Sequence, residues 1–167
     1  MAPIVILGCG YVGTRIARAA LAEGRPVRVC ARSTGRLTPL GALGAQVKYL
    51  DGGVPKGFTA ALNGMAGATI VYSIPPVTSL PPGQAMRAAL QAAYAIGAGG
   101  FLYLSSAGLY GAQPDDDAWI DEDTPIAHDD PPMSNVRSDE DAILASGFDA
   151  LRWHRACRSE GDWRSCG

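Results

Sequence analysis

Three glycines near the start of the sequence, Gly8, Gly10 and Gly13, have the spacing of a phosphate-binding turn. An apolar, β-branched run over 3–7 predicts a buried parallel strand before them, and a helical pattern over 11–23 follows. In such a corner the first glycine permits the tight turn and the second lets a pyrophosphate approach bare backbone. The third lets helix and strand pack closely, so that the helix N–H groups face the phosphates.

This motif predicts a dinucleotide site, but an ordinary strand-to-helix turn is the alternative. A chain with 21 glycines among 167 residues produces such spacings by chance. The position of the motif, at the end of a first strand and before a second strand, favours the dinucleotide site.

The side chains that follow the second predicted strand, over 26–31, bear on which dinucleotide binds. An acidic residue about 20 residues past the glycines holds the ribose 2′-hydroxyl of NAD in this kind of site. Arg32 and Ser33 stand there instead, and an arginine binds a 2′-phosphate that a carboxylate would repel. NADP is therefore favoured over NAD, unless Arg32 is only a solvated loop residue. Asp51, after the third strand, is placed either to bond an adenine amino group or to form a turn.

Strand-like and helix-like segments alternate along the chain as far as residue 153. Further strands are expected over 45–50, 68–73, 100–105 and 148–153, and further helices over 37–43, 58–65, 83–96 and 135–145. This alternation predicts an α/β fold, a Rossmann-like doubly wound parallel sheet in three α/β/α layers. We expect one dinucleotide-binding domain over 1–153 and an irregular tail over 154–167.

Composition narrows the class of protein. Hydrophobic residues make up 47% and charged residues 18%, as in a globular domain, and a net charge of −2 argues against a nucleic-acid partner. No apolar run approaches the roughly 20 residues of a membrane span, so no membrane partner is expected. The four cysteines lack metal-ligand spacing, which predicts reduced thiols, no metal and a cytoplasmic location. Eight basic and two acidic residues over 1–56 suit an anionic cofactor.

An apolar run over 101–104 leads into Ser105-Ser106-Ala107-Gly108-Leu109-Tyr110-Gly111. This segment resembles the short-chain dehydrogenase/reductase superfamily, in the extended and atypical branch often labelled NAD-dependent epimerase/dehydratase. The stretch from Trp119 to Pro125 is similar to the family's Glu-x-x-Pro segment. With the glycine turn, the resemblance covers about residues 3–153. It implies a nicotinamide cofactor and a small-molecule substrate with an alcohol or carbonyl group, often a sugar nucleotide.

By this resemblance Ser106 stands at the family's catalytic serine, whose hydroxyl bonds the reacting oxygen. Ser105 would orient the strand end, although both serines could instead only satisfy backbone groups. Tyr110 is a candidate proton donor. The residues predicted to contact the cofactor are Gly8, Gly10, Tyr11, Val12, Gly13, Arg32, Ser33, Asp51, Ile74, Pro75 and Ser105.

The sequence departs from the family where a Tyr-x-x-x-Lys pair is expected on the next helix. In the family this lysine lowers the pKa of the tyrosine, which passes the proton. The register that fits best puts Asn135 at the tyrosine position and Asp139 at the lysine position, and the only lysines are Lys48 and Lys56. We therefore expect the usual relay to be absent, with Arg137 as a candidate substitute cation.

Relatives continue past the sixth strand into a substrate-binding lobe, whereas residues 154–167 are aperiodic and rich in Arg, Trp, Ser, Cys and Gly. This predicts a truncated or frameshifted product whose uncovered strand edge and apolar face favour self-association. The predicted function is NAD(P) binding in a protein resembling an epimerase, dehydratase or reductase. A non-catalytic dinucleotide-binding sensor or interaction module is the alternative, and a non-functional remnant is a third possibility.

Overall fold

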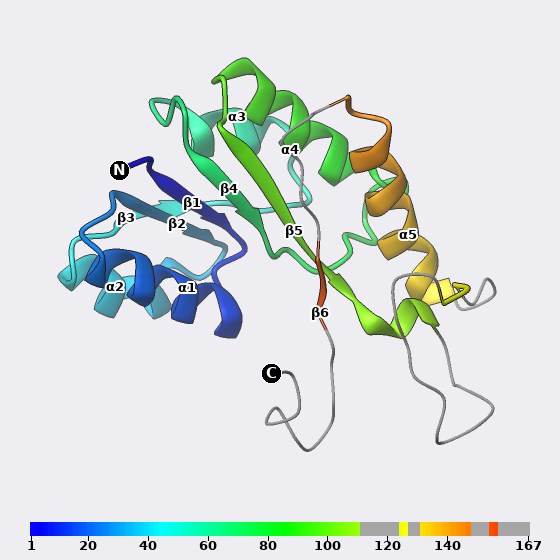
Figure 1. The fold of residues 1–167 in the computed structure, drawn as a ribbon, viewed down its shortest axis with the longest axis horizontal. Helices are drawn as coiled ribbons and strands as arrows, with labels where there is room; N and C mark the ends of the chain where they lie inside the picture. The colour runs from blue at the N-terminus through cyan, green and yellow to red at the C-terminus, as the bar shows by residue number, and fades with distance from the viewer. Residues whose placement is uncertain (111–123, 127–130, 148–153, 157–167) are drawn as a thin grey trace.

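The computed structural model describes residues 1–110, 124–126, 131–147 and 154–156, in which strands and helices alternate along the chain (Figure 1). The strands are β1 (Ile4–Leu7), β2 (Val27–Ala31), β3 (Gln46–Tyr49), β4 (Thr69–Tyr72), β5 (Gly100–Ser106) and β6 (His154–Ala156). The α-helices are α1 (Tyr11–Ala22), α2 (Thr38–Ala42), α3 (Lys56–Leu62), α4 (Gln84–Ala95) and α5 (Pro131–Leu144). Two 3-10 helices, η1 (Thr34–Leu37) and η2 (Ala107–Tyr110), follow β2 and β5.

The strands form one parallel sheet in the order β3-β2-β1-β4-β5-β6. The chain builds outward from β1 to β3, then crosses back to pair β4 with the other side of β1. Open parallel sheets of this kind place their ligands at the carboxyl ends of the strands, where the strand order reverses. The predicted Rossmann-like α/β fold is confirmed.

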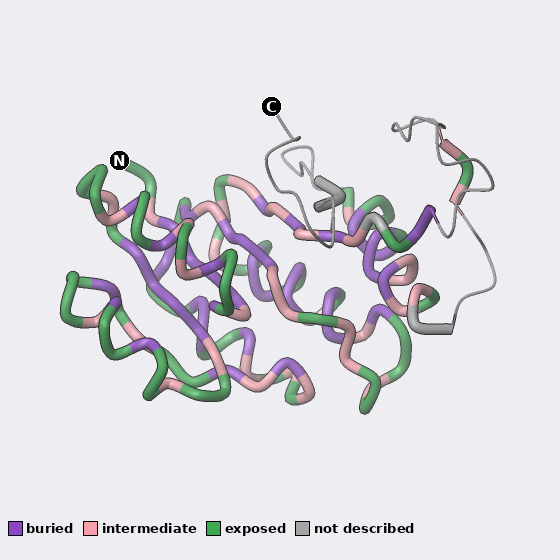
Figure 2. The backbone as a smooth tube through the Cα atoms, turned by 90° about the horizontal axis from the view of Figure 1, so that it is seen from below, coloured by how far each residue is buried: buried purple, intermediate pink, exposed green. Residues whose placement is uncertain are grey.

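Helices cover both faces of the sheet and enclose two cores (Figures 1 and 2). On one face Ala17 of α1 and Leu40 of α2 pack with Ile6 and Val29 of the strands. The other core lies against α3, α4 and α5, and Tyr72 of β4 is at its centre. The aromatic rings of Phe58, Phe101 and Tyr103 lie 5.8–6.3 Å from the Tyr72 ring, centroid to centroid. The four residues of β1 are all buried, as expected for a strand with helices on both sides.

Two elements differ from the sequence-based expectation. Helix α5 begins at Pro131 rather than at 135, because proline is tolerated in the first turn of a helix. Strand β6 pairs in parallel with β5, so the sheet extends into the segment 154–167. The expectation that this segment is irregular is therefore wrong for residues 154–156. The strand expected over 148–153 lies outside the described residues.

The helices of the described ranges include none that combines the length and the apolar character of a membrane span. The same ranges contain no group of three or more His, Cys, Asp or Glu side chains placed to hold a metal ion.

Candidate functional site

The turn between β1 and α1 places its three glycines in three different environments. Gly8 has φ = 85°, and a Cβ there would lie 2.7 Å from main-chain atoms of Ser73 and Ile74. A Cβ at Gly13 would lie 2.9 Å from Cγ2 of Ile6, so α1 packs directly on β1. At Gly10 the nearest atom to such a Cβ is the Gly8 carbonyl oxygen, 4.0 Å away. The turn is therefore crowded on its inner side and open at Gly10.

Main-chain hydrogen bonds hold this turn against the end of β2. The amides of Gly8 and Cys9 both donate to the Cys30 carbonyl oxygen, at 3.0 and 2.8 Å. The Thr14 hydroxyl donates to the Gly10 carbonyl oxygen at 2.7 Å. Directly after Gly10, the N–H groups of Tyr11 and its successors belong to the first turn of α1. A helix offers these N–H groups no acceptor within itself. They add to the positive end of the helix dipole.

A cavity of about 670 Å³ opens at the edge where β1, β2, β3 and β4 end. Its lining comes from 8–10 after β1, from 31–33 and Arg36 around η1, from 50–53 after β3, and from 73–79 after β4. It thus brings together seven of the predicted cofactor residues: Gly8, Gly10, Arg32, Ser33, Asp51, Ile74 and Pro75. This is the strand edge at which the strand order predicts a ligand.

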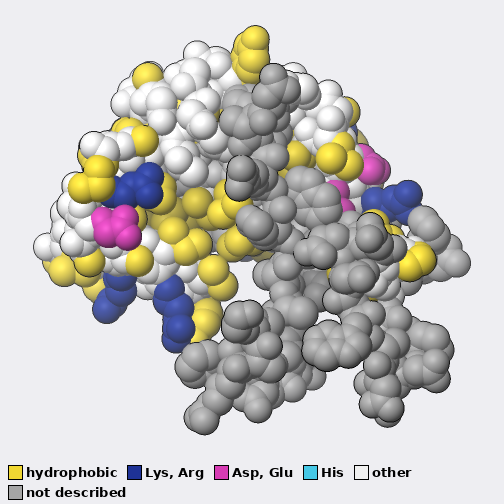
Figure 3. All heavy atoms as spheres, viewed as in Figure 1, with side chains coloured by type: hydrophobic (Ala, Val, Ile, Leu, Met, Phe, Trp, Pro, Cys, Tyr) yellow, Lys and Arg dark blue, Asp and Glu magenta, His cyan; other side chains and the backbone are white. Residues whose placement is uncertain are grey.

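Arg36 lines this cavity although the sequence analysis did not single it out. The 3-10 helix η1 folds the chain back after β2, so that Arg36 and Arg32 line one cavity. The sequence did carry a signal for Arg36, since it is a second basic residue only four positions after Arg32. Arg36 also lines a neighbouring cavity of about 470 Å³, together with Tyr11, Arg15 and Arg18. Basic side chains project from the part of the molecule that carries α1 and α2 (Figure 3).

The other predicted contacts at this corner lie outside the larger cavity. Tyr11 is 74% exposed and has the Arg15 guanidinium 4.5 Å from its ring centroid. Val12 is exposed and Gly13 is buried against β1.

For Asp51 the turn alternative holds, because its Oδ1 accepts a hydrogen bond from the Gly53 amide at 2.9 Å. The same side chain is nevertheless part of the cavity wall.

The end of β5 carries the candidate catalytic residues. Leu7 of β1 pairs with Tyr72 of β4, which pairs with Tyr103 of β5, so Ser106 lies at the same edge of the sheet as Gly8. Two strand spacings, about 10 Å in all, separate β5 from β1. The half-buried Ser106 accepts a hydrogen bond from the Gly108 amide through Oγ at 3.1 Å. Tyr110, at the end of η2, is buried. None of Ser105, Ser106 and Tyr110 lines the 670 Å³ cavity.

The residue of α5 that approaches Ser106 is Met133. A Cβ on Gly108 would lie 2.9 Å from the Met133 sulfur and 3.2 Å from the Ser106 hydroxyl oxygen, so both atoms border the same small space. Asn135 is two positions further along the helix, about 200° around its axis from Met133. The register expected from the sequence, with Asn135 at the tyrosine position and Asp139 at the lysine position, stays a prediction. Arg137 lies one turn after Met133, on the same side of α5.

Asp139 and Glu140 of α5 are buried instead of facing the cavity. Burial raises the pKa of Asp139 to about 6, against the opposing effects of a hydrogen bond with Tyr103 and of the Arg87 charge. Burial also raises the pKa of Tyr103, and the neighbouring Asp139 adds to this effect. The Ser105 hydroxyl donates to Glu140 Oε1 at 2.5 Å.

No protein-family model matches this sequence, and a search of curated proteins returned no significant match. Solved structures do match. A putative NAD-dependent epimerase/dehydratase from Methylobacillus flagellatus is 26% identical, with a TM-score of 0.71 over 92% of this chain and 53% of that one. The anaerobilin reductase ChuY from Escherichia coli O157:H7 is 27% identical, with a TM-score of 0.55 over 64% of this chain and 52% of that one.

A third solved structure, a mutant UDP-glucuronic acid 4-epimerase from Bacillus cereus, is 17% identical, with a TM-score of 0.73 over 92% of this chain and 55% of that one. It holds UDP-4-deoxy-4-fluoro-glucuronic acid and NAD. The Methylobacillus flagellatus structure confirms the predicted resemblance to NAD-dependent epimerase/dehydratase proteins, and the 4-epimerase structure shows the same fold. The chain spans about half the length of the structures it matches.

Proposed function

We propose that this chain binds a nicotinamide dinucleotide in the 670 Å³ cavity, with its diphosphate against Gly10 and the first turn of α1. The observation that carries the proposal is the open backbone at Gly10, where no atom lies nearer than 4.0 Å to the place of a Cβ. A phosphate can approach the main chain there and accept from helix N–H groups. A nicotinamide ring, when bound, gives or takes a hydride at the substrate carbon.

We further propose that NADP is preferred to NAD. Arg32, Ser33 and Arg36 border the cavity where β2 ends, and Asp51 is the only acidic residue among the described residues of its wall. Two guanidinium groups and a hydroxyl suit a 2′-phosphate, whereas a ribose 2′-hydroxyl is usually held by a carboxylate at this place.

The substitution Gly10→Ala tests dinucleotide binding. The added methyl group has room in the fold, so the melting temperature should stay at the wild-type value. The same methyl group occupies the approach of the diphosphate, and loss of one or two charge-assisted hydrogen bonds should weaken NADPH binding about 10–100-fold. Calorimetric titration with NADPH measures this loss. Gly35→Ala is the matched control, because a Cβ there meets nothing within 4 Å and Gly35 does not line the cavity.

The double variant Arg32→Ala/Arg36→Ala tests the preference for NADP. Loss of the two cations should weaken NADPH binding about 100-fold and NADH binding about threefold or less. Lys48→Ala, which removes an exposed cation of β3 away from the cavity, is the control for net charge. Equal losses for the two cofactors would reject the NADP preference and leave dinucleotide binding intact.

A second candidate function, non-catalytic dinucleotide sensing, is supported by Met133. A thioether beside Ser106 cannot pass a proton, as the tyrosine of the family does. This supports the proposal that the Tyr–Lys relay is absent. If the chain is a sensor, NADPH binds but its nicotinamide absorbance stays constant during single-turnover mixing with a panel of carbonyl substrates. A decrease in absorbance identifies a reductase or epimerase with another proton donor, for which Tyr110 is the candidate.

We propose small molecules with an alcohol or carbonyl group, including sugar nucleotides, as the ligands beside the cofactor. The bound UDP-sugar analogue of the 4-epimerase structure supports this class. The free, buried thiols of Cys9 and Cys30 support the cytoplasmic location. Self-association remains a prediction, to be checked by light scattering at high protein concentration.

A further inference from the structure

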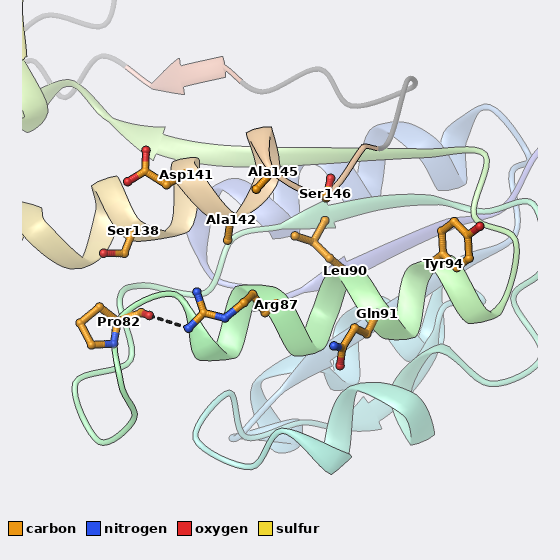
Figure 4. A pocket seen from close by; sticks show the side chains of 10 residues that line it. All are labelled: Pro82, Arg87, Leu90, Gln91, Tyr94, Ser138, Asp141, Ala142, Ala145 and Ser146. Carbon is orange, nitrogen blue, oxygen red and sulfur yellow. Dashed lines mark hydrogen bonds between the residues drawn. The ribbon is translucent and has the colours of Figure 1, made fainter.

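Two neighbouring acidic residues of α5 point into the protein rather than into the cofactor cavity. Asp139 is 5% exposed and Glu140 is 4% exposed. The next residue, Asp141, is exposed and lines a groove between α4 and α5 together with Ser138 (Figure 4). Burial of a carboxyl group is costly unless hydrogen bonds compensate it. The contacts of these two side chains therefore call for an explanation.

Both side chains are hydrogen-bonded to hydroxyl groups of β5. Asp139 is bonded to Tyr103, and Glu140 Oε1 accepts from Ser105 Oγ at 2.5 Å. Tyr103 and Ser105 are buried residues at alternate positions of the strand, so their side chains point to the same face. Helix α5 is thus attached to β5 at two successive positions, and the second is the residue just before Ser106.

The attachment at Ser105 determines how the end of β5 is oriented. Successive side chains of a strand point to opposite faces, so a Ser105 hydroxyl held toward α5 leaves the Ser106 side chain on the other face. There the Ser106 hydroxyl accepts from the Gly108 amide, which begins the return of the chain through η2. A shift of the Ser105 main chain away from α5 would change the direction of Ser106 as well.

We propose that Glu140 is a positioning residue, which holds Ser105 and thereby aims the Ser106 hydroxyl at the nicotinamide half of the cofactor site. The inference rests on the proposed function, since it assigns Ser106 to that half. Glu140 does not line the cavity, and its hydrogen bond with the end of β5 is the one from the Ser105 hydroxyl. Its oxygen serves as a hydrogen-bond acceptor, so a glutamine, which keeps that oxygen, should replace it.

The first arm of the test needs no ligand. Amide hydrogen exchange of ¹⁵N-labelled protein is followed by NMR for wild type, Glu140→Ala, Glu140→Gln and Asp141→Ala. Glu140→Ala should accelerate exchange at Gly108 about tenfold relative to the β1 amides, which corresponds to the loss of one hydrogen bond. Glu140→Gln and the control Asp141→Ala, which removes an exposed carboxyl group one residue away, should match wild type within about twofold.

The second arm compares NADPH with adenosine 2′,5′-bisphosphate, which carries only the adenine half of the cofactor. Glu140→Ala should weaken NADPH binding about fivefold to tenfold and leave the fragment unchanged. Glu140→Gln should restore NADPH binding. A merely structural role would weaken both ligands equally and accelerate exchange at β1 and Gly108 together. If Glu140→Ala does not fold, Ser105→Ala removes the donor of the same bond and must give the same pattern.

The results of the two arms separate the positioning role of Glu140 from the proposed cofactor binding. Wild-type exchange at Gly108 in Glu140→Ala, or a Glu140→Gln variant that behaves like Glu140→Ala, overturns it. If wild-type protein binds neither NADPH nor the fragment while Gly108 still responds to Glu140→Ala, the proposed function fails and the contact of Glu140 with the strand end stands. If NADPH and fragment bind wild type but weaken in parallel in Glu140→Ala, the positioning role fails and the proposed function stands.

Discussion

The half of the sheet formed by β1, β2 and β3 and the half formed by β4, β5 and β6 both bury charged side chains, but they satisfy them differently. In the first half the Arg28 guanidinium, 7% exposed, donates to the carbonyl oxygens of Ala61 and Asn63 and to the Gln46 side chain, at 2.8–3.1 Å. Every one of these acceptors is neutral. In the second half Asp139 is bonded to Tyr103, an acid–hydroxyl contact that depends on pH.

The two halves therefore differ in how their geometry depends on pH. The first half holds its main chain by close packing of glycines and by a permanently charged donor, so its geometry is independent of pH near neutrality. The second half holds α5 against β5 through carboxyl groups, and the raised pKa of one of them, Asp139, makes this attachment respond to protonation. Most of the candidate cofactor cavity is thus built on the pH-independent half, with residues 73–79 after β4 added by the other half, and the candidate reacting groups are built on that other half.

Gly8→Ala should give the largest loss of stability in the first half. A methyl group there combines φ = 85° with an approach of 2.7 Å to the main chain of Ser73 and Ile74, where no flexible side chain can yield. The free energy of unfolding should fall by about 4 kcal/mol, as measured by urea denaturation. Gly24→Ala is the matched control, because Gly24 has φ = 72° and no atom within 4 Å of its Cβ position. It should cost about 1 kcal/mol, from backbone strain alone.

Arg28→Ala should cost about 3 kcal/mol, because it leaves the buried carbonyl oxygen of Ala61 and the part-buried one of Asn63 without this donor. Arg28→Lys should recover only part of the loss, since one ammonium group cannot reach acceptors on α3 and β3 together. The loss should be the same at pH 5 and pH 8 in urea denaturation. A strong pH dependence would contradict the contrast drawn between the two halves.

Asp139→Asn should remove a pH dependence that arises in the second half. The folded-state pKa, about 6, lies above the ordinary value of 3.8. The wild-type stability associated with this group is therefore fully present below pH 3.8 and is lost as the pH rises through 6. The total loss is at most about 3 kcal/mol. Asparagine still accepts from Tyr103 but does not ionise, so the variant should be the more stable protein at pH 8.

The measurement is the free energy of unfolding from pH 3.5 to pH 8, with Asp141→Asn as the exposed control on the same helix. The groups that face Asp139 are Tyr103, Tyr72 and Arg87, and Glu140 is its neighbour along the helix. None of the first three changes its charge between pH 4 and pH 7. An Asp139→Asn profile as steep as that of wild type would show that Asp139 is not the source of the slope.

The sequence predicted the first half of the sheet better than the second, for a physical reason. Gly8, Gly10 and Gly13 act through main-chain conformation and the absence of side chains, and both are visible in residue type and spacing. The strands were likewise evident from short apolar runs. Arg36 was missed because its place depends on η1, which turns the chain back toward Arg32.

In the second half the important contacts join residues that are far apart in the chain. Glu140 and Ser105 are separated by 35 positions, and an acidic pair beside Asp141 has the pattern of a solvated helix face. Met133 was missed because its approach to the Gly108 turn joins residues 25 positions apart, and an apolar residue after two prolines carries no sign of a place beside Ser106. The position of β6 depends on pairing with β5, for which the local sequence of 154–156 carries no signal.

Arg15→Ala should have the smallest effect on the first half. The guanidinium lies over the Tyr11 ring, but the ring is 74% exposed and the contact is solvated, so its loss should cost about 0.5 kcal/mol in urea denaturation. Arg15 also lines the smaller cavity beside the cofactor site, together with Arg36. If NADPH binding weakens by about tenfold while stability is unchanged, the two cavities act as one anion-binding region. If stability falls by more than about 1 kcal/mol, the exposed side of α1 contributes to the fold as its buried side does, and the contact of Arg15 with Tyr11 is worth more than a solvated one.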